Sequence, residues 1–358
     1  MDYSESCGRF ESRGKEYPTV RRRIRPPADR RKPGLAKGGV ECFTGGMQTV
    51  CRRDFLKASC LCAAGTGLLW TNPVPAIEPL KRAGNPRLRL SLAAYSFRGY
   101  FKDSDRQRDA GPIPAKRIDL FQFIDYCADQ GCDGTELTSY YFPKDLDHAF
   151  LLGIKQHAFL RGIGISGTAV GNTFTLPAGS KRDAEIAAVK KWIDHAALMG
   201  APHVRIFAGA APTGVSPEQA RLLCVGAIEE CCEYAGSKGI FLGIENHGGI
   251  VATADGLLEI VRAVKSPWLG VNLDTGNFHT DDPYEDLAKI APYAVNVQVK
   301  GEMRPSGKAS EPADLARLVK ILREVNYQGY VALEYESKED PWTAVPRLLK
   351  ELKALIAA

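Results

Sequence analysis

One pattern decides the fold, and it occurs in two stretches of the sequence, IFLGIENH at residues 240–247 and LGVNLDTG at residues 269–276. Each is a short apolar run that reaches an acid near its end, Glu245 in the first and Asp274 in the second. Runs of this length and composition are typical of buried parallel strands. A helical pattern at residues 253–264 separates them. We therefore interpret this part of the chain as a strand–helix–strand unit whose strands end in acids.

The same alternation extends from residue 88 to the C-terminus. Strict alternation of strand and helix predicts parallel strands with right-handed crossovers, and eight such units favour closure into a (β/α)8, or TIM, barrel. No GxGxxG follows the first predicted strand, which argues against a dinucleotide-binding domain. We expect strands at 88–94, 134–138, 162–169, 204–208, 240–245, 269–274, 294–300 and 330–335, and helices near 116–130, 145–161, 181–199, 216–238, 253–264, 283–291, 312–325 and 341–355.

Proline marks two of the expected helix starts. Pro217 follows Ser216, and Pro312 follows Glu311. Proline is favoured in the first turn of a helix because the N–H that it lacks would have no partner there. These pairs therefore predict helices that begin at about residues 216 and 312.

Length and charge fit one soluble barrel at residues 88–358. Such a barrel needs roughly 250 residues, so the 358-residue chain holds one and not two. Residues 1–76 contain 14 Lys and Arg against 7 Asp and Glu, whereas the remainder contains 33 against 35. The basic balance belongs to the N-terminal part, so the barrel gives no argument for nucleic-acid binding. The ten cysteines include no CxxC pair, and we interpret those of the barrel as free thiols.

The first 76 residues have the composition of a leader. Residues 1–46 are rich in Arg and Gly without apolar periodicity, which predicts disorder or a misassigned start before Met47. Residues 47–76 contain CRRDFLK at 51–57 and a short apolar run, and this segment resembles a twin-arginine export signal. The resemblance implies handling by the twin-arginine export machinery and a periplasmic or otherwise exported protein.

Polar residues stand at the ends of several predicted strands. In a barrel of this type, functional side chains come from the carboxyl ends of the strands. Glu245, Asp274 and Glu334 end three strands, and three converging carboxylates need a compensating cation. With the Gln298 amide as a fourth oxygen ligand, they predict a divalent metal site, Mn²⁺ or Mg²⁺ before Co²⁺ or Zn²⁺.

At these residues the chain resembles the xylose isomerase-like barrels, the sugar phosphate isomerase and epimerase family, over about residues 88–355. Members place Glu, Asp, His and Glu on strands five to eight around one metal. Glu245, Asp274 and Glu334 match three of these positions, and Gln298 stands where the family has His. Because Gln offers no nitrogen ligand, this departure favours Mn²⁺ or Mg²⁺ over Zn²⁺. A second departure is Asn277, where many relatives have His after Asp-Thr-Gly.

The resemblance implies a metal-dependent isomerase or epimerase of a sugar or keto-sugar. Glu245 and Glu334 would exchange a proton at the carbon next to a carbonyl through an enediolate. Substrate would be bound by Glu136, His247, Lys300 and Arg205. Two of these have plainer alternatives, since Arg205 could pair with an inward acid and Lys300 could be a charge at the rim.

Two further functions stay open at this point. A lyase or dehydratase acting on a keto-sugar or 3-keto-glycoside would begin with the same proton abstraction. A non-catalytic sugar-binding barrel is favoured only by the Gln at strand seven. In every case the expected partner is a small carbohydrate, and the sequence leaves open whether the chain forms a homo-oligomer.

Overall fold

The computed structural model describes residues 77–103 and 116–358. The predicted leader segments, 1–46 and 47–76, therefore lie outside the described residues. Among the helices of the described ranges, none combines the length and the apolar character needed to cross a membrane.

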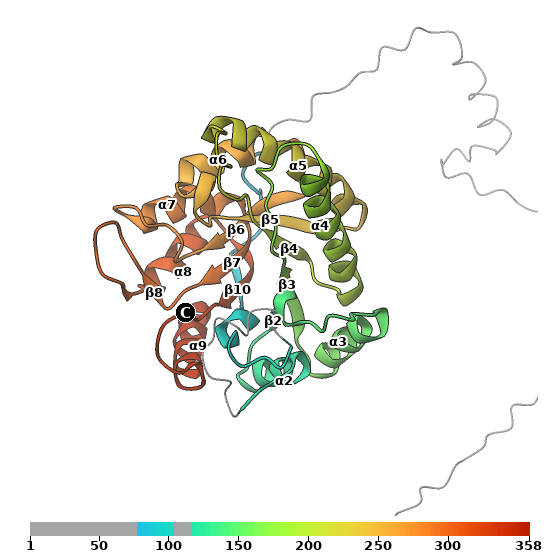
Figure 1. Cartoon of the computed structure of the whole chain (residues 1–358). Coiled ribbons are helices and arrows are strands. Elements are labelled where there is room, and N and C mark those ends of the chain that lie inside the picture. Colours follow the sequence, from blue (N-terminus) through green and yellow to red (C-terminus); the bar gives the residue numbers. More distant parts are fainter. Residues whose placement is uncertain (1–76, 104–115) are drawn as a thin grey trace, which may run out of the picture. The chain divides into compact units, whose positions relative to one another are not determined.

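Eight parallel strands close into a barrel in the order β1-β10-β7-β6-β5-β4-β3-β2 (Figure 1). This confirms the predicted TIM barrel, and every barrel strand overlaps its predicted range. The strands are β1 Arg87–Ala93, β2 Gly134–Thr138, β3 Gly164–Ala169, β4 His203–Ile206, β5 Phe241–Glu245, β6 Leu269–Asp274, β7 Ala294–Val299 and β10 Gln328–Leu333.

Helices surround the barrel on its outside, as Figure 1 shows. Their apolar residues pack on the outer faces of the strands in one continuous core. The α-helices are α2 Leu120–Asp129, α3 His148–Leu160, α4 Ser180–Met199, α5 Pro217–Ser237, α6 Ala254–Ala263, α7 Pro283–Ile290, α8 Leu315–Glu324 and α9 Pro341–Ala357. Short 3-10 turns, η1 Ala94–Phe97 and η3 Ser139–Tyr141, follow β1 and β2 and carry aromatic residues to the mouth of the barrel.

The barrel closes where its first and last strands meet. β1 pairs with β10 over six residues, from Arg87 opposite Gln328 to Leu92 opposite Leu333. On its other edge β1 pairs with β2, with Ala93 opposite Glu136. The two ends of the barrel sequence therefore complete a single hydrogen-bonded ring.

One of the two helix starts predicted from proline is confirmed and the other is wrong. Helix α5 begins at Pro217, and Ser216 caps it by accepting a hydrogen bond from the Gln219 N–H at 3.2 Å. Helix α8 begins only at Leu315, because the Asp314 carboxylate accepts from the Arg317 N–H at 2.9 Å and so forms the cap. Pro312 belongs instead to a small antiparallel hairpin, β8 Glu302–Met303 with β9 Glu311–Pro312, which the sequence did not predict.

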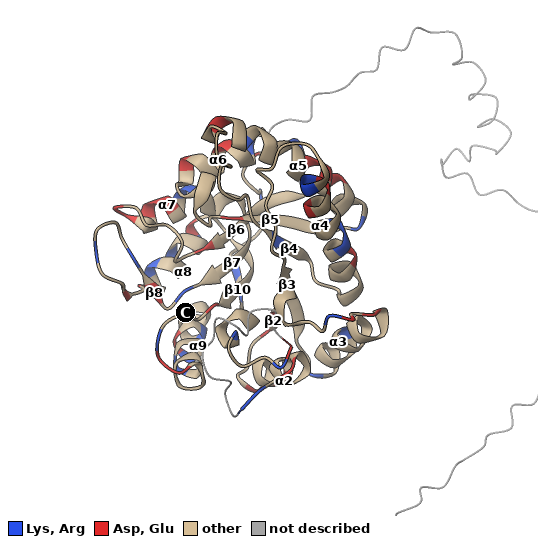
Figure 2. Cartoon of the chain, viewed as in Figure 1, with Lys and Arg blue, Asp and Glu red and all other residues tan. Residues whose placement is uncertain are grey.

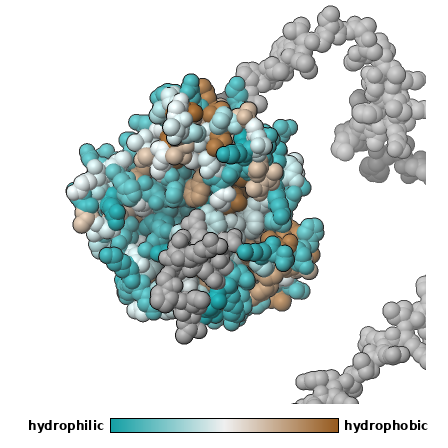
Figure 3. All heavy atoms as spheres, in the orientation of Figure 1, coloured by the Kyte–Doolittle hydropathy of each residue, from teal (hydrophilic) through white to brown (hydrophobic). Residues whose placement is uncertain are grey.

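Charge and hydropathy differ between the outside of the barrel and its strands. Charged residues lie mainly along the outer helices and loops, while the strands are mostly uncharged (Figure 2). The visible surface is largely hydrophilic, with apolar areas that include the region of α3, where Leu152, Phe159 and Leu160 are exposed (Figure 3). The cysteines of the barrel are free and buried, as predicted: Cys127, Cys132, Cys224, Cys231 and Cys232.

Candidate active site

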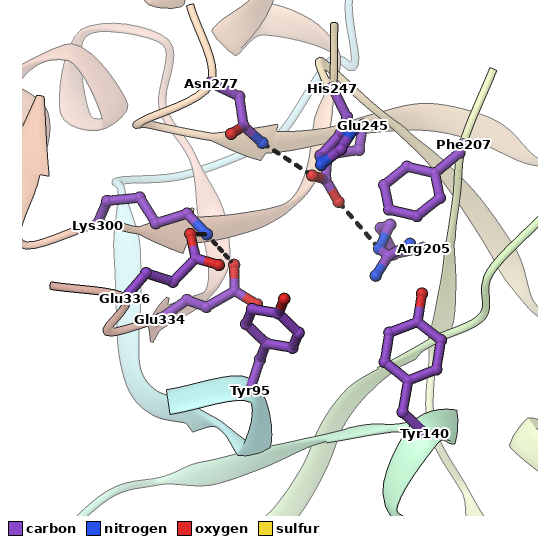
Figure 4. A pocket seen from close by; sticks show the side chains of 10 residues that line it. All are labelled: Tyr95, Tyr140, Arg205, Phe207, Glu245, His247, Asn277, Lys300, Glu334 and Glu336. Atoms are coloured by element: carbon purple, nitrogen blue, oxygen red, sulfur yellow. Dashed lines mark hydrogen bonds and ion pairs between the residues drawn. The ribbon is translucent and has the colours of Figure 1, made fainter. Parts of the chain in front are cut away.

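A cavity opens at the carboxyl ends of the strands, where the sequence predicts the site. Its walls combine three acids from different parts of the barrel, two cations and several aromatic rings (Figure 4). Lining the cavity are Tyr95, Tyr140, Arg205, Phe207, Glu245, His247, Asn277, Lys300, Glu334 and Glu336.

Beneath this cavity lies a layer of buried amides around Glu136. Strand β7 turns Asn296 and Gln298 inward because alternate residues of a strand share a face. Their side-chain amides donate to the Glu136 carboxylate at 2.7 and 2.5 Å, and Asn272 donates to the Gln298 carbonyl at 2.6 Å. Burial raises the pKa of Glu136 to about 7, with the Glu334 charge adding to the effect. Glu136, predicted to bind substrate, thus lies below the cavity and not in its wall.

His203 lies in the same buried interior, at the start of β4. A Cβ on Gly167 would stand 1.8 Å from its Cε1, so the close approach of β3 to this ring requires glycine there. Burial lowers the pKa of His203 from 6.5 to about 4. The ring is therefore neutral in the folded protein at ordinary pH.

We expect His203 to make the protein less stable in acid. The unfolded chain takes up a proton at this residue near pH 6.5, whereas the folded protein does so only near pH 4. Lowering the pH through this window therefore favours unfolding, by about 3 kcal/mol in total. Denaturant titrations at several pH values should show this loss in the wild type and not in His203→Gln. Equal pH dependence of the two proteins would contradict the prediction.

Glu245, the last residue of β5, is held from two sides. Its Oε2 lies 2.9 Å from Arg205 Nε in a buried ion pair, and its Oε1 accepts from the Asn277 amide at 2.9 Å. Burial raises the pKa of Glu245 to about 7, although the Arg205 charge acts in the opposite direction. Arg205 also lies over the Phe207 ring, with 3.8 Å from Cζ to the ring centroid. Arg205 is thus paired with an inward acid, and at the same time it lines the cavity.

Lys300, the first residue after β7, reaches into the centre of the acidic cluster. Its Nζ lies 3.1 Å from Asp274 Oδ2, 2.6 Å from Glu334 Oε2 and 2.5 Å from Glu336 Oε2. Burial alone would lower the pKa of Lys300, but the three neighbouring carboxylates raise it well above its usual value. Only 7% of the residue is exposed, so Lys300 is a buried cation and not a charge at the rim.

The four predicted metal ligands do not share one open coordination point. Both oxygens of Glu245 have partners, Arg205 and Asn277, and both polar atoms of Gln298 bond to amide-layer residues. Asp274 Oδ2 is buried without a hydrogen bond, and the ammonium of Lys300 faces it. No group of three His, Cys, Asp or Glu side chains with metal-binding geometry occurs within residues 77–103 and 116–358. In this arrangement the donor set does not fit a divalent metal.

The structure therefore sorts the predicted site residues into two sets. It brings Glu245, Glu334, Lys300, Arg205 and His247 together in the cavity wall. It places Glu136, Asp274 and Gln298 behind or beneath that wall. His247 packs on Phe207, with 4.6 Å between ring centroids. Tyr140 also lines the cavity, although the sequence analysis does not predict it. The one feature of the sequence that could identify it is its position directly after the predicted strand at 134–138.

A closed parallel barrel with acids at its strand ends defines a class of TIM-barrel proteins, and sequence comparison places the chain within it. The family described as "Xylose isomerase-like TIM barrel" matches residues 124–353, so the chain belongs to that family. No curated protein is detectably similar to the chain.

Several solved structures share the fold. The 3-keto-D-glucoside 4-epimerase YcjR from E. coli is 14% identical with a TM-score of 0.56, over 75% of this chain and 100% of that one. The IOLI protein, solved with a bound zinc atom, is 17% identical with a TM-score of 0.59, over 75% and 96%. D-psicose 3-epimerase, solved in the presence of D-fructose, is 16% identical with a TM-score of 0.58, over 75% and 97%. At such identities the likeness is one of fold.

Proposed function

We propose that the chain is an isomerase or epimerase of a sugar or keto-sugar, and that it moves a proton at the carbon next to a carbonyl. One observation carries the proposal: Glu245 and Glu334 face one cavity, and each lies beside a buried cation. Their strands, β5 and β10, are three places apart in the barrel ring, so the two acids approach a ligand from different sides. The sugar epimerases among the structures of similar fold support this choice.

The proposed reaction uses only side chains of this chain. Glu245 takes the proton from the α-carbon, and the electrons of that C–H bond form a C=C bond while the carbonyl oxygen becomes an enediolate oxygen. The ammonium of Lys300 stabilises this negative charge in a site with little water, where such interactions are strong. Glu334, carrying a proton taken from solvent, then donates it to the same carbon from its other face while the carbonyl re-forms, or to the neighbouring carbon while the hydroxyl proton of the first carbon passes to the enediolate oxygen. The first outcome is epimerisation and the second is isomerisation.

Binding in this scheme is divided among the remaining wall residues. Arg205 and His247 offer hydrogen bonds to hydroxyl oxygens, while Tyr95 and Tyr140 provide flat walls against which a sugar ring packs. The residues present do not fit the metal that the family resemblance implies, so no step of the proposed reaction depends on one.

Proton exchange with solvent tests the proposal directly. Purified protein is incubated in D2O with a panel of ketoses and keto-glycosides, and the α-proton signal is followed by NMR. We expect loss of this signal for at least one sugar, followed by the appearance of its epimer or isomer. The absence of exchange for every sugar of the panel would contradict the proposed function.

The exchange rate should rise with pH through about 7. Glu245 must be ionised to accept a proton, and burial has raised its pKa to about 7. Below that value most of the base is protonated and inactive, so the initial rate should fall about tenfold for each pH unit. Initial exchange rates between pH 5 and 9 check this expectation. A rate that stays flat across the range would remove Glu245 as the base.

A second candidate function is elimination from a keto-glycoside, and an adjoining cavity favours it. Asn277, Lys300 and Glu336 line both this cavity and the main one, and the second is enclosed in part by Arg304 and Ser310 of the β8–β9 hairpin region. A glycoside with its ring in the main cavity would place its leaving group here. Glu245 would take the α-proton, the electrons of that C–H bond would form a C=C bond as the C–O bond at the β-carbon breaks, and the departing oxygen would take a proton from water.

Product analysis distinguishes the two candidates. A chromogenic 3-keto-glycoside releases a coloured aglycone only if elimination occurs. Epimerisation leaves the glycosidic bond intact, so aglycone release at the rate of proton exchange would establish the lyase and contradict the epimerase.

A further inference from the structure

We infer that the ammonium group of Lys300 replaces the divalent metal of the family in this chain, so that the site works with a built-in cation. The inference deepens the proposed function, on which its catalytic part rests. Its other part, that the site binds no divalent metal, stands independently of what the protein catalyses.

The position of Lys300 Nζ carries the first step. It contacts Asp274 Oδ2 at 3.1 Å and Glu334 Oε2 at 2.6 Å, and both residues are predicted metal ligands. A metal ion bound to the same two oxygens would stand about 2.0–2.2 Å from each and so directly beside the ammonium. Two cations at such separation repel strongly in a buried site. The lysine and a metal therefore exclude each other.

The second step concerns the other two predicted metal ligands, Glu245 and Gln298, whose polar atoms already have partners. Arg205 lies against Glu245 in a pair whose side chains are each about one-twentieth exposed. Gln298 is fixed by hydrogen bonds to Glu136 and Asn272 in the buried amide layer. To bind a metal, Glu245 and Gln298 would have to give up these contacts. Arg205 and Glu136 would then stay buried without a partner, which costs free energy.

The third step concerns access of the substrate to the ammonium. Lys300 has three N–H donors, and three carboxylates face them. Asp274 and Glu334 are buried, but the Glu336 side chain is 38% exposed. Glu336 can therefore swing out into solvent, and a substrate oxygen can take its place at the third N–H. Lys300 then contacts the reacting oxygen, as the metal does in a metal-dependent enolisation.

Metal binding is the deciding measurement. The full chain is dialysed against EDTA and then titrated with Mn²⁺, with free Mn²⁺ measured by its EPR signal and thermal unfolding recorded in parallel. We expect no binding at micromolar Mn²⁺, no rise in Tm and no change in the α-proton exchange rate. Tight stoichiometric binding, or activity lost with EDTA and restored by Mn²⁺, would overturn the inference.

A designed reversal gives a second, positive test. A triple variant, Lys300→Met with Arg205→Met and Gln298→His, removes both cations that occupy the predicted ligands and supplies the nitrogen ligand, so it should gain Mn²⁺ binding in the same titration. The matched control is Lys238→Met, which removes a surface lysine paired with Asp194 and should bind no more Mn²⁺ than the wild type. A triple variant that folds, as circular dichroism would show, and binds no Mn²⁺ would contradict the inference. If it does not fold, the wild-type titration still decides.

Activity of single variants tests the catalytic part. Lys300→Met should lower the exchange rate on the order of 10²–10³-fold, as expected for loss of an oxyanion-stabilising group. Lys300→Arg, which keeps a cation, should recover part of the rate without added metal. An unchanged rate in Lys300→Met would refute the catalytic role. A wild type that exchanges no sugar and binds no Mn²⁺ would refute the proposed function alone.

Discussion

Glu245→Gln is expected to lower the rate of α-proton exchange on the order of 10²–10⁴-fold, the usual contribution of a general base. Gln has nearly the same shape, so the contact with Asn277 can persist while the proton acceptor is lost. The variant should still bind the sugar, because His247, Lys300 and the aromatic walls remain. Exchange is measured by NMR in D2O, and binding by calorimetry with the same sugar.

Glu334→Gln separates the two carboxylate roles. If Glu245 removes the proton and Glu334 returns it on the other face, this variant should still exchange the proton of the substrate, yet form little epimer. With the epimer as the starting sugar, Glu334→Gln should lose proton exchange, whereas Glu245→Gln should keep exchange and form little product. Glu233→Gln, on the exposed face of α5, is the matched control and should match the wild type. Equal activity of Glu245→Gln and the control would refute the assignment.

Arg205→Met is expected to destabilise the fold by about 3–5 kcal/mol at pH 8, because it leaves the Glu245 carboxylate buried without its cation. The side chains of the pair are 6% and 5% exposed, so water cannot replace the guanidinium. The loss should be smaller at pH 5.5, since removing the cation raises the pKa of Glu245 further and the acid can then take a proton. The measurement is the unfolding free energy at both pH values.

A surface ion pair provides the control for this prediction. Arg221 Nε lies 2.7 Å from Glu259 Oε2, a geometry as close as that of the buried pair, but the Glu259 side chain is 59% exposed. Arg221→Met should therefore cost less than about 1 kcal/mol. Similar costs for the two arginines would show that burial does not govern the Arg205 pair.

The sequence was sufficient for the barrel because local patterns decide its elements. Each strand is a short apolar run, and each α-helix except α4 begins at a residue whose side chain caps it, so neither kind of element depends on distant residues. The hairpin was missed because β8 and β9 are two residues each, too short for any periodicity. The start of α8 was misplaced because Asp314 and Pro312 both favour a helix start, and only the backbone bond to Asp314 decided between them.

The residues of the site could be predicted from the sequence, but the side chains that they contact could not be predicted as well. Glu245 and Glu334 could be identified because strand ends meet at one face of a barrel. The partners of Lys300 could not be predicted, since its long flexible stem reaches acids from β6 and β10 that only the closed barrel brings together. The amide layer around Gln298 depends likewise on contacts across about 160 residues of chain.

The pairing of β1 with β10 has a consequence for synthesis on the ribosome. Arg87 lies opposite Gln328, so β1 keeps an unpaired edge until almost the whole chain has been made. During elongation the partly formed sheet has two open edges, the feature through which nascent chains join one another. Ribosome-bound chains that stop before residue 328 should therefore depend on chaperones, and protease resistance should appear abruptly once β10 has left the exit tunnel.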